Sequence, residues 1–379
     1  MPQVQYFLHS QILFLTLLNI SLKKMQNTVT PLDLYWVLGE QHLGPLEYYF
    51  AKVLKKNGKN VNYINIHTLY SGNWKTLSVY SHRFPRKYDN SVQKKYLKII
   101  NDVLLKKYKE EKPSYIFIYN DCKILPETLE FIKQNGTKII SFLGDDPNYL
   151  FSAKKTFLLS VMYADFVIVP DTGWIKGLRL LGVKNLIYSP IGTDTEIFFK
   201  TEPGRGDIEK YGADILFIGT GYYLNSWGIK RASILNELSG MDFKIFGDDK
   251  WEEVLPYFSG LRKHFIKQPL SAENVNIACN CAKIYPIVVN TGVLNGVSTR
   301  VFDCIASEIF VLAEYKKDVD RLFPGGELVS YHSKRELRDK AEYFLKNEKE
   351  MKDHIERAVK IVKEKYTLDI LVKNILEQI

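Results

Sequence analysis

The chain of 379 residues is long enough for two domains of ordinary size, and 46% hydrophobic and 13% aromatic residues allow large buried cores. Four cysteines are too few for a disulfide framework, and the C-x-C pair Cys279 and Cys281 has no partner pair at zinc-site spacing, so free thiols in a reducing compartment are expected. The net charge of +9 lies in the first half: residues 1–200 hold 26 Lys and Arg against 16 Asp and Glu, and residues 201–379 hold 26 against 27.

An apolar stretch near the N-terminus, YFLHSQILFLTLLNISLKK, is about as long as a membrane span. Polar residues interrupt it, and it has neither a preceding basic region nor a following small-residue cleavage site, so a secretory signal is not expected. Residues 1–25 are therefore interpreted as an interfacial helix, a weak anchor, or a segment upstream of a natural start near Met25.

Strand and helix periodicities alternate along the first half of the chain. Strands are predicted at residues 32–40, 59–66, 114–120 and 137–147, with helices at 44–58, 90–111 and 126–136 between them, and residues 159–171 and 174–190 repeat the helix–strand unit. Such alternation favours a parallel sheet with helices on both faces.

A polar, glycine-bearing stretch from residue 192 to 213 interrupts this alternation and is interpreted as a linker. The alternation then restarts with strands at 214–221, 242–249 and 284–290 and helices at 228–240, 271–282, 333–347 and from about 348. The fold class is therefore α/β, with two Rossmann-like domains whose parallel sheets face each other across a cleft. The predicted boundaries are 26–198 for the first domain, 199–212 for the linker, 213–360 for the second domain, and 361–379 for a helix that returns to the first.

The stretch NGVSTRVFDCIASEIFVL, residues 295–312, predicts a loop, a helix and a strand. Ser298 is a suitable N-cap, so the helix start at Ser298 and Thr299 is a candidate anion site. Arg300 and Asp303 share one helical face. The arginine can neutralise a phosphate and the carboxylate can accept two hydrogen bonds from a ribose diol, as a nucleoside diphosphate requires. A surface ion pair on a packing helix is an equally open reading.

A second candidate stretch, FIGTGYYLNSWGIKR, places Gly219, Thr220 and Gly221 between a strand and a helix. It is shorter than the full dinucleotide fingerprint. Gly221 would let a substrate approach the backbone closely. Lys230 or Arg231 can reach a phosphate from the following helix, or can equally be solvated.

Seven segments in order resemble the CgeB-like (spore maturation protein B-like) glycosyltransferases, which have the GT-B architecture. The resemblance covers roughly residues 32–366, in FIGT, Gly247 with Trp251, the strand ending at Asn290, RVFDCIAS, GGELVSY, SFLGDDP and LRLLGVKNLIYSPIGTD. It implies a nucleotide-sugar donor bound by the second domain, with Gly247 near the donor, and an acceptor bound by the first.

The chain departs from this family at the motif helix. Asp303 stands where the family has a glutamate, and Glu308 stands where it has a glycine. Retaining GT-B enzymes often pair two glutamates eight residues apart, and Asn295 lies eight residues before Asp303, so Asn295 is a further donor-binding candidate.

No cofactor is expected beyond the nucleotide-diphosphate sugar, which acts as a co-substrate. Backbone N–H groups and cations at a helix start can stabilise a departing diphosphate without a metal ion. Asp318 and Asp320 form D-x-D, the metal motif of another glycosyltransferase architecture, but they fall in a predicted surface helix, so no metal site is assigned.

An inverting transferase also needs a base on the acceptor side. Glu40, His42, Asp145 and Asp146 follow first-half strands. Asp146 is the first catalytic candidate and His42 the second. The competing interpretations are a turn residue before proline for Asp146 and an exposed loop histidine for His42.

The basic first half is either a solvated helix face or a surface for an anionic partner. The expected partners are the nucleotide-sugar donor, a glycan, protein or lipid-linked acceptor, and an anionic membrane surface. Neutralising Lys94, Lys95 and Lys98 is predicted to weaken association with anionic vesicles or with the acceptor and to leave donor affinity unchanged. Nucleic acid is not expected because no binding motif is present. The expected location is the cytoplasm, including a peripheral position at the inner face of the membrane.

Two other functions remain open from the sequence. One is a catalytically impaired relative that binds a nucleotide or a glycan, which the changes at Asp303 and Glu308 favour. The other is a nucleotide-sugar 2-epimerase, which would need an acid/base cluster that the sequence does not show. Hydrolysis of a nucleotide-sugar in water would separate an enzyme from a binding protein.

Overall fold

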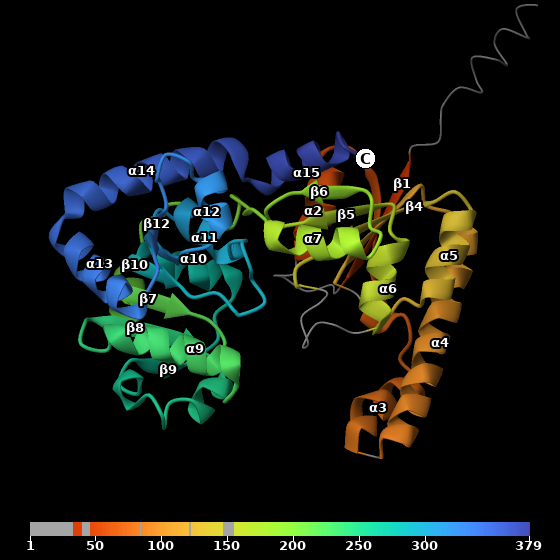
Figure 1. Ribbon diagram of the computed structural model, residues 1–379, viewed down its shortest axis with the longest axis horizontal. Helices are drawn as coiled ribbons and strands as arrows, with labels where there is room; N and C mark the ends of the chain where they lie inside the picture. Colours follow the sequence, from red (N-terminus) through yellow and green to blue (C-terminus); the bar gives the residue numbers. More distant parts are fainter. Residues whose placement is uncertain (1–32, 40–45, 84, 121–122, 147–154) are drawn as a thin grey trace, which may run out of the picture.

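Two parallel six-stranded sheets, one in each half of the chain, form the framework of the protein (Figure 1). The computed structural model describes residues 33–39, 46–83, 85–120, 123–146 and 155–379. The prediction of two Rossmann-like α/β domains is confirmed.

The first sheet has the strand order β2-β1-β3-β4-β5-β6. Its strands are β1 (Leu34–Gly39), β2 (Asn60–Asn65), β3 (Tyr115–Tyr119), β4 (Lys138–Phe142), β5 (Phe166–Val169) and β6 (Leu186–Tyr188). The helices are α2 (Leu46–Lys56), α3 (Asn73–Tyr80), α4 (Arg86–Glu111), α5 (Pro126–Gln134), α6 (Lys155–Tyr163) and α7 (Thr172–Leu180), with 3-10 turns η1 (Ile66–Thr68) and η2 (Ser81–Arg83). The long helix that the sequence places at 90–111 thus begins four residues earlier.

The second sheet has the order β12-β11-β10-β7-β8-β9. Its strands are β7 (Ala213–Ile218), β8 (Phe243–Gly247), β9 (Phe265–Lys267), β10 (Ala282–Ile287), β11 (Phe310–Glu314) and β12 (Val329–Tyr331). The helices are α8 (Arg205–Tyr211), α9 (Ser226–Leu235), α10 (Ala272–Asn280), α11 (Thr299–Ala306), α12 (Lys317–Leu322), α13 (Lys334–Lys346), α14 (Glu348–Lys365) and α15 (Leu368–Leu376), with 3-10 turns η3 (Asn236–Leu238), η4 (Asp249–Glu253) and η5 (Ser259–Leu261).

Residue type explains why these segments form a buried parallel sheet. The strand β3 reads YIFIY, a run of aromatic and β-branched residues, and its three central residues are buried. Helix α2 places Phe50, Val53 and Leu54 at a spacing of three and four residues, which puts them on one helical face. This face packs in the same core as Phe117 of β3.

The strand order reverses once in each sheet, between β1 and β3 in the first and between β7 and β10 in the second. In open α/β sheets, ligands bind beyond the carboxyl ends of the strands at such a reversal. The two reversals therefore mark the edges where a shared site is expected.

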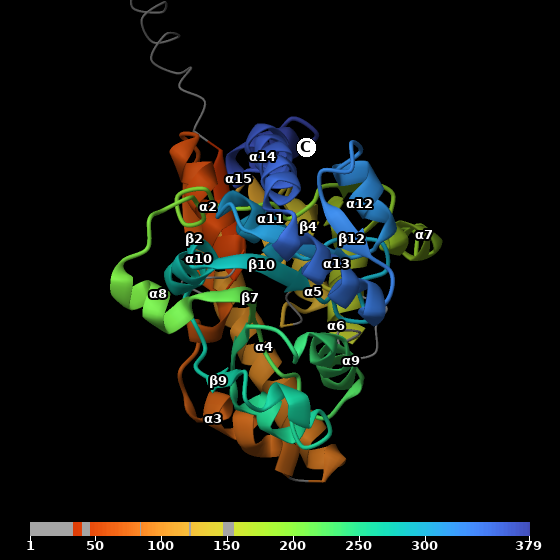
Figure 2. The ribbon, with the colours of Figure 1, turned by 90° about the vertical axis from the view of Figure 1, so that its left-hand side faces the viewer.

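The C-terminal helices connect the two halves (Figure 2). Helix α14 packs against α11 of the second half, and α15 packs against α2 of the first. The linker and the returning chain pair directly, because Thr193 N donates to Tyr366 O at 3.1 Å and Leu368 N donates to Thr193 O at 2.9 Å.

The predicted boundary at residue 361 falls inside α14, which continues to Lys365 because Val359 and Val362 still pack in the second core. The helix ends where the Tyr366 ring inserts beside Phe302 and where Thr367 caps the next helix by accepting from Ile370 N. The helix that returns to the first half, α15, begins at Leu368.

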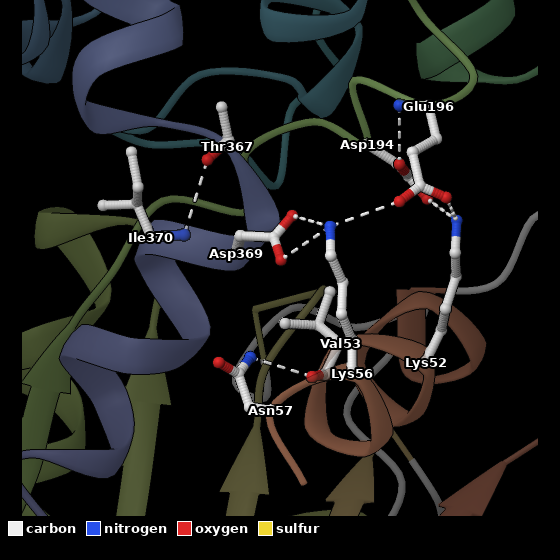
Figure 3. A network of polar contacts seen from close by, with 9 residues as sticks. All are labelled: Lys52, Val53, Lys56, Asn57, Asp194, Glu196, Thr367, Asp369 and Ile370. Atoms are coloured by element: carbon white, nitrogen blue, oxygen red, sulfur yellow. Dashed lines mark hydrogen bonds and ion pairs between the residues drawn. The ribbon is translucent and has the colours of Figure 1, made fainter.

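An ion-pair network joins the segment around Asp194 and Glu196 to helices α2 and α15 (Figure 3). Lys52 of α2 lies 2.9 Å from the buried Asp194 and 2.7 Å from Glu196, and Lys56 lies 3.2 Å from both Glu196 and Asp369 of α15. Burial alone would lower the pKa of Lys52, but its hydrogen bonds to Glu196 and Asp194 outweigh this and raise the pKa to about 12.

The predicted linker at 199–212 is not wholly irregular, because residues 205–211 form α8. The remainder is fixed to α10: Phe199 N donates to Asn276 Oδ1 at 3.1 Å, and Thr201 N donates to Asn280 Oδ1 at 2.9 Å. Within the described ranges, no helix combines the length and the apolar character needed to cross a membrane.

Candidate functional site

A cavity of about 550 Å³ lies between the two halves, at the strand reversals of both sheets. This volume is in the range of pockets that hold small molecules and cofactors. Its walls include Tyr49, Tyr119, Thr193 and Asp194 from the first half and the linker, and Gly219, Thr220, Tyr222, Arg231, Ser298, Thr299, Arg300 and Asp303 from the second half.

The start of α11 opens on this cavity. Ser298 is the N-cap of the helix, and its hydroxyl accepts from Arg300 N at 3.3 Å. Ser298, Thr299 and Arg300 all line the cavity. Backbone N–H groups of a first helical turn, together with the positive end of the helix dipole, favour an anion at this position.

Asp303 lies one turn further along α11 and is 8% exposed. Its Oδ1 accepts from Thr193 Oγ1 at 2.8 Å, and its Oδ2 lies 3.5 Å from an Arg300 guanidinium nitrogen. Burial raises the pKa of the Asp303 carboxyl to about 6, although Arg300 and the Thr193 hydrogen bond act in the opposite direction. The carboxylate is therefore ionised at neutral pH and retains acceptor capacity towards the cavity.

Arg231 of α9 reaches the same cavity and is held by carbonyl groups. Its guanidinium donates to Thr220 O at 2.6 Å and to Val288 O at 3.3 Å, and it stacks 4.5 Å from the Tyr222 ring. Burial lowers the pKa of this guanidinium, and no carboxylate pairs with it among the described residues. A fixed cation with unmet charge is suited to an anionic ligand. The neighbouring Lys230 instead pairs with Glu314 at 2.7 Å.

The loop after β7 is held by one carboxylate. Asp248 accepts from Thr220 Oγ1 at 2.5 Å and from Gly221 N at 2.9 Å. A Cβ on Gly221 would lie 2.2 Å from Trp251 N, so this glycine serves the close packing of the loop on η4, and it does not line the cavity. Gly219 and Thr220 do line the cavity, and a role for Gly221 in admitting a substrate stays a prediction.

Two further donor-binding candidates lie away from the cavity walls. Gly247 packs under the Trp251 ring, where a Cβ would come within 2.5 Å of the ring atoms, and the Trp251 indole donates to Gly219 O at 2.8 Å. Asn295 donates through Nδ2 to Thr172 Oγ1 at 3.1 Å. Gly247 thus supports the Trp251 ring and Asn295 bonds across to the first half, and their part in donor binding stays a prediction.

Of the two catalytic candidates, Asp146 belongs to the described residues. A smaller side extension continues from the cavity between the two halves. Asp146 is buried after β4 and lines neither the cavity nor this extension. Asp145 accepts from Asn120 Nδ2 at 2.8 Å, and burial raises the pKa of its carboxyl. His42 and Glu40 lie outside the described residues. The role of a base stays a prediction for Asp146 and His42.

An interdomain cluster of hydrogen bonds holds the loop that precedes α11. Asp171, which is 2% exposed and caps α7, accepts from Leu294 N at 2.8 Å and from Asn295 N at 3.0 Å. Thr172 in turn donates to Asp318 through its backbone N at 3.0 Å and its hydroxyl at 2.5 Å. The first half thus fixes the approach to the anion site of the second.

This cluster also accounts for the D-x-D sequence. Asp318 is 2% exposed rather than on a surface helix, and Tyr315 donates through its hydroxyl to Asp320 at 2.8 Å. Both carboxylates therefore have structural partners. Among the residues that the structure describes, no group of three or more His, Cys, Asp or Glu side chains is arranged to hold a metal ion.

Sequence analysis missed two residues that the fold brings to the cavity. Thr193 is buried and orients Asp303 across the domain boundary. Tyr49 of α2 is 8% exposed, and its hydroxyl has no hydrogen-bond partner among the described residues. Burial and the nearby charge of Asp194 raise the pKa of this hydroxyl, so it stays protonated and can donate to a ligand. No local pattern marks either residue, because their neighbours in space are more than 100 positions away.

Comparisons with known proteins agree with this geometry. A family model described as glycosyl transferase-like matches residues 230–377, which include Arg231 and all of α11. The spore protein CgeB of Bacillus subtilis (strain 168) is 21% identical over 267 residues, which cover 65% of this chain and 76% of that protein.

Solved structures share the fold over most of the chain. Sucrose-phosphate synthase from Thermosynechococcus elongatus superposes with a TM-score of 0.66 at 10% identity, and Anabaena Alr3699/HepE in complex with UDP superposes with a TM-score of 0.60 at 13% identity. Each match covers 91% of this chain and 98% of the other. The chain therefore has the GT-B fold, carries a glycosyl transferase-like region in its second half, and is confirmed to resemble CgeB, as its motifs predict.

Proposed function

We propose that this protein transfers a sugar from a nucleotide-diphosphate donor to a glycan, protein or lipid-linked acceptor. The observation that carries the proposal is the composition of the interdomain cavity. It combines the start of α11, the carbonyl-anchored guanidinium of Arg231 and the buried carboxylate of Asp303. These three groups match a diphosphate and a ribose diol, which are common to all such donors.

In this arrangement the diphosphate lies against the N–H groups that follow Ser298, between Arg231 and Arg300. Cleavage of the bond from sugar to phosphate builds negative charge on the departing diphosphate and positive charge on the sugar. Hydrogen-bond donors of the protein that are already fixed in a partly dry cavity stabilise the charge on the diphosphate without reorganising. The protein's own cations then take the part that a metal ion plays elsewhere, so we expect transfer without an added metal.

The ribose is assigned to Asp303. Its carboxylate is one helical turn from the anion site, and Thr193 already orients one of its oxygens at 2.8 Å. A diol can donate two hydrogen bonds to such a carboxylate. Support comes from the fold relatives, since Anabaena Alr3699/HepE is known in complexes with UDP and with UDP-glucose.

The acceptor is assigned to the side of the cavity that faces the first half. A side extension of about 150 Å³ continues there and is lined by Gly144, Asp171 and Trp174 from the first half together with Asn290 and Gly296 from the second. The acceptor base remains assigned to the neighbouring strand ends, where Asp146 and His42 are the candidates.

Calorimetric titration of a panel of nucleoside diphosphates and their sugars tests the proposal, with Arg231→Gln as the diagnostic variant. We expect the wild type to bind at least one nucleoside diphosphate, and Arg231→Gln to weaken that binding about tenfold or more because a charge-assisted contact is lost. Affinity for the corresponding nucleoside, which has no phosphate, should change little.

The matched control is Arg262→Gln, which removes an exposed cation of the same half far from the cavity walls. It should bind every nucleotide as the wild type does. A wild type that binds no nucleotide would contradict the proposal. Binding without any transfer or hydrolysis of the matching nucleotide-sugar would instead indicate an impaired relative, and interconversion of sugar epimers would indicate an epimerase.

A further inference from the structure

A helical hairpin projects from the first half on the side of the molecule opposite α14 and α15 (Figures 1 and 2). It consists of α3, η2 and the beginning of α4, and we call the described residues from 73 to 83 and from 85 to 98 the hairpin tip. Helix α3 contacts α4 and η2 and has no buried residue of its own. Trp74 of α3 packs against the core of the first half, and the other apolar side chains of the helix are not part of that core.

Large apolar and aromatic side chains are exposed at the hairpin tip. Leu77 is 45% exposed, Val79 59%, Tyr80 50% and Tyr88 63%. Single exposed hydrophobic residues are ordinary, but four on one short projection are typical of a surface that meets an apolar partner. Arg83 lies 5.3 Å from the Tyr80 ring, so cationic and aromatic groups are adjacent there.

The same tip is strongly basic. Residues 73–98 contain seven Lys and Arg and a single acid, Asp89, for a net charge of +6. The Ser81 hydroxyl donates to that acid. Six of the cations are exposed, and none of them pairs with a carboxylate among the described residues: Arg83, Arg86, Lys87, Lys94, Lys95 and Lys98.

We propose that the hairpin tip docks on an anionic lipid surface. Unpaired Lys and Arg are attracted to the negative surface potential of such a bilayer. Tyr side chains favour the level of the lipid headgroups, and short apolar side chains such as Leu77 and Val79 enter the boundary below them. A purely polyanionic partner accounts for the cations and leaves the exposed Leu and Val without a role.

The position of the tip suits this partner. Both views place α3 and the start of α4 at one end of the molecule, beyond the strands of the first sheet and away from α14 and α15. A flat surface can therefore meet the tip without contacting α14 or α15.

Co-sedimentation of the full chain with vesicles tests the proposal. The wild type should bind phosphatidylcholine vesicles that contain about 30% phosphatidylglycerol and should bind pure phosphatidylcholine weakly. Reversing three tip charges, Arg83→Glu with Arg86→Glu and Lys87→Glu, should reduce binding at least tenfold, since each cation near such a surface contributes about fivefold.

A second variant, Leu77→Gln with Val79→Gln, keeps all charges and uses a good helix former. It should reduce vesicle binding several-fold and leave binding to heparin unchanged. The matched control reverses three exposed lysines of α14, Lys349→Glu with Lys352→Glu and Lys360→Glu, and so changes the net charge equally. That control should bind vesicles as the wild type does.

Three results would overturn the proposal: a wild type that ignores anionic vesicles, equal losses in the tip and α14 reversals, or full vesicle binding by the glutamine variant. The last result, together with loss of heparin binding in the charge reversal, would identify a polyanion site instead of a lipid surface. Circular dichroism should be unchanged in every variant, because the replaced side chains are exposed. Nucleotide affinity, measured separately, does not bear on any of these outcomes.

Discussion

At the scale of single residues, Asp303 combines a cost in stability with a benefit in binding. Its buried carboxylate has a pKa of about 6, above the value near 4 expected in the unfolded chain. The folded state therefore binds more protons between about pH 4 and pH 6, and stability falls as pH rises through that window. Above pH 6 the ionised group opposes folding and is retained, in our interpretation, for the ribose.

Asp303→Asn should accordingly change stability and affinity in opposite directions. The amide oxygen can still accept from Thr193, and the buried charge is gone. At pH 8 the free energy of unfolding should rise by on the order of 1–3 kcal/mol, and the gain should vanish below about pH 4. Denaturant titrations at both pH values measure this, and a variant that is less stable at pH 8 would contradict it.

The affinity for nucleotides should also depend on the ionisation of Asp303. Affinity for a nucleoside diphosphate should fall tenfold to a hundredfold in Asp303→Asn, because charge-assisted hydrogen bonds contribute roughly 1.5–3 kcal/mol. In the wild type, affinity should decrease as pH is lowered through about 6. Calorimetry across this range checks both effects. A pH-independent affinity shared by wild type and variant would make Asp303 a packing residue only.

At the scale of elements, the end of α11 shows how the chain accommodates Glu308, where the CgeB-like pattern that it resembles has glycine. Glu308 has a φ of 60°. Glu308 N donates to Ile305 O at 2.9 Å and Ile309 N donates to Cys304 O at 3.2 Å, which is the Schellman arrangement. The turn after the helix is thus preserved despite a side chain that disfavours the left-handed region.

Glu308→Gly should therefore stabilise the protein by roughly 1 kcal/mol, because glycine adopts this conformation without steric cost. The exposed pair with Lys363 at 3.6 Å contributes little and offsets the gain only slightly. Glu308→Ala is the control, since it removes the pair but keeps the Cβ. Chemical denaturation of the three proteins decides the matter: equal stabilities for the glycine and alanine variants would show that the φ angle is not the cause.

Element-scale predictions succeed where a pattern is local. The alternation of strand and helix, the Ser298 cap and the start of α14 at Glu348 all follow from neighbouring residues. The sequence pattern does not predict helix α8, because the helix has only seven residues and lies in a polar, glycine-bearing stretch. The break at Tyr366 is also invisible in sequence, since it depends on the ring's packing beside Phe302.

At the scale of the whole molecule, Asp171 joins the two halves through buried hydrogen bonds. Asp171→Ala would leave the N–H groups of Gly173, Leu294 and Asn295 without their acceptor. We expect the free energy of unfolding to fall by roughly 2–4 kcal/mol and the radius of gyration in solution scattering to increase as the halves separate.

Lys56→Ala is the control for this prediction. It removes the exposed pairs to Glu196 and Asp369 that also join the halves (Figure 3). Exposed ion pairs are screened by solvent, so the melting temperature and the radius of gyration should stay unchanged. An Asp171→Ala protein with the dimensions of the wild type would show that the α15 contacts alone set the domain arrangement.

Local sequence patterns were sufficient to predict the fold class and to select the segment that is proposed as the anion site. Hydrophobic period and turn residues are local properties, and Ser298, Arg300 and Asp303 belong to one short helix, so their proximity follows from helical geometry. Arg231 was identifiable as one of two adjacent cations, but only the structure separates it from Lys230, which pairs with Glu314.

Which residues share the cavity, in contrast, depends on contacts between segments that are far apart in the sequence. Thr193, which follows the first sheet, and Tyr49 of α2 line the same cavity as Asp303. Gly247 instead packs against Trp251, and Asn295 bonds to Thr172 of the first half. These placements depend on how two sheets approach each other across a linker and a returning helix. That approach is fixed by contacts such as Thr193 with Tyr366, which join positions 173 residues apart and leave no periodic trace in the sequence.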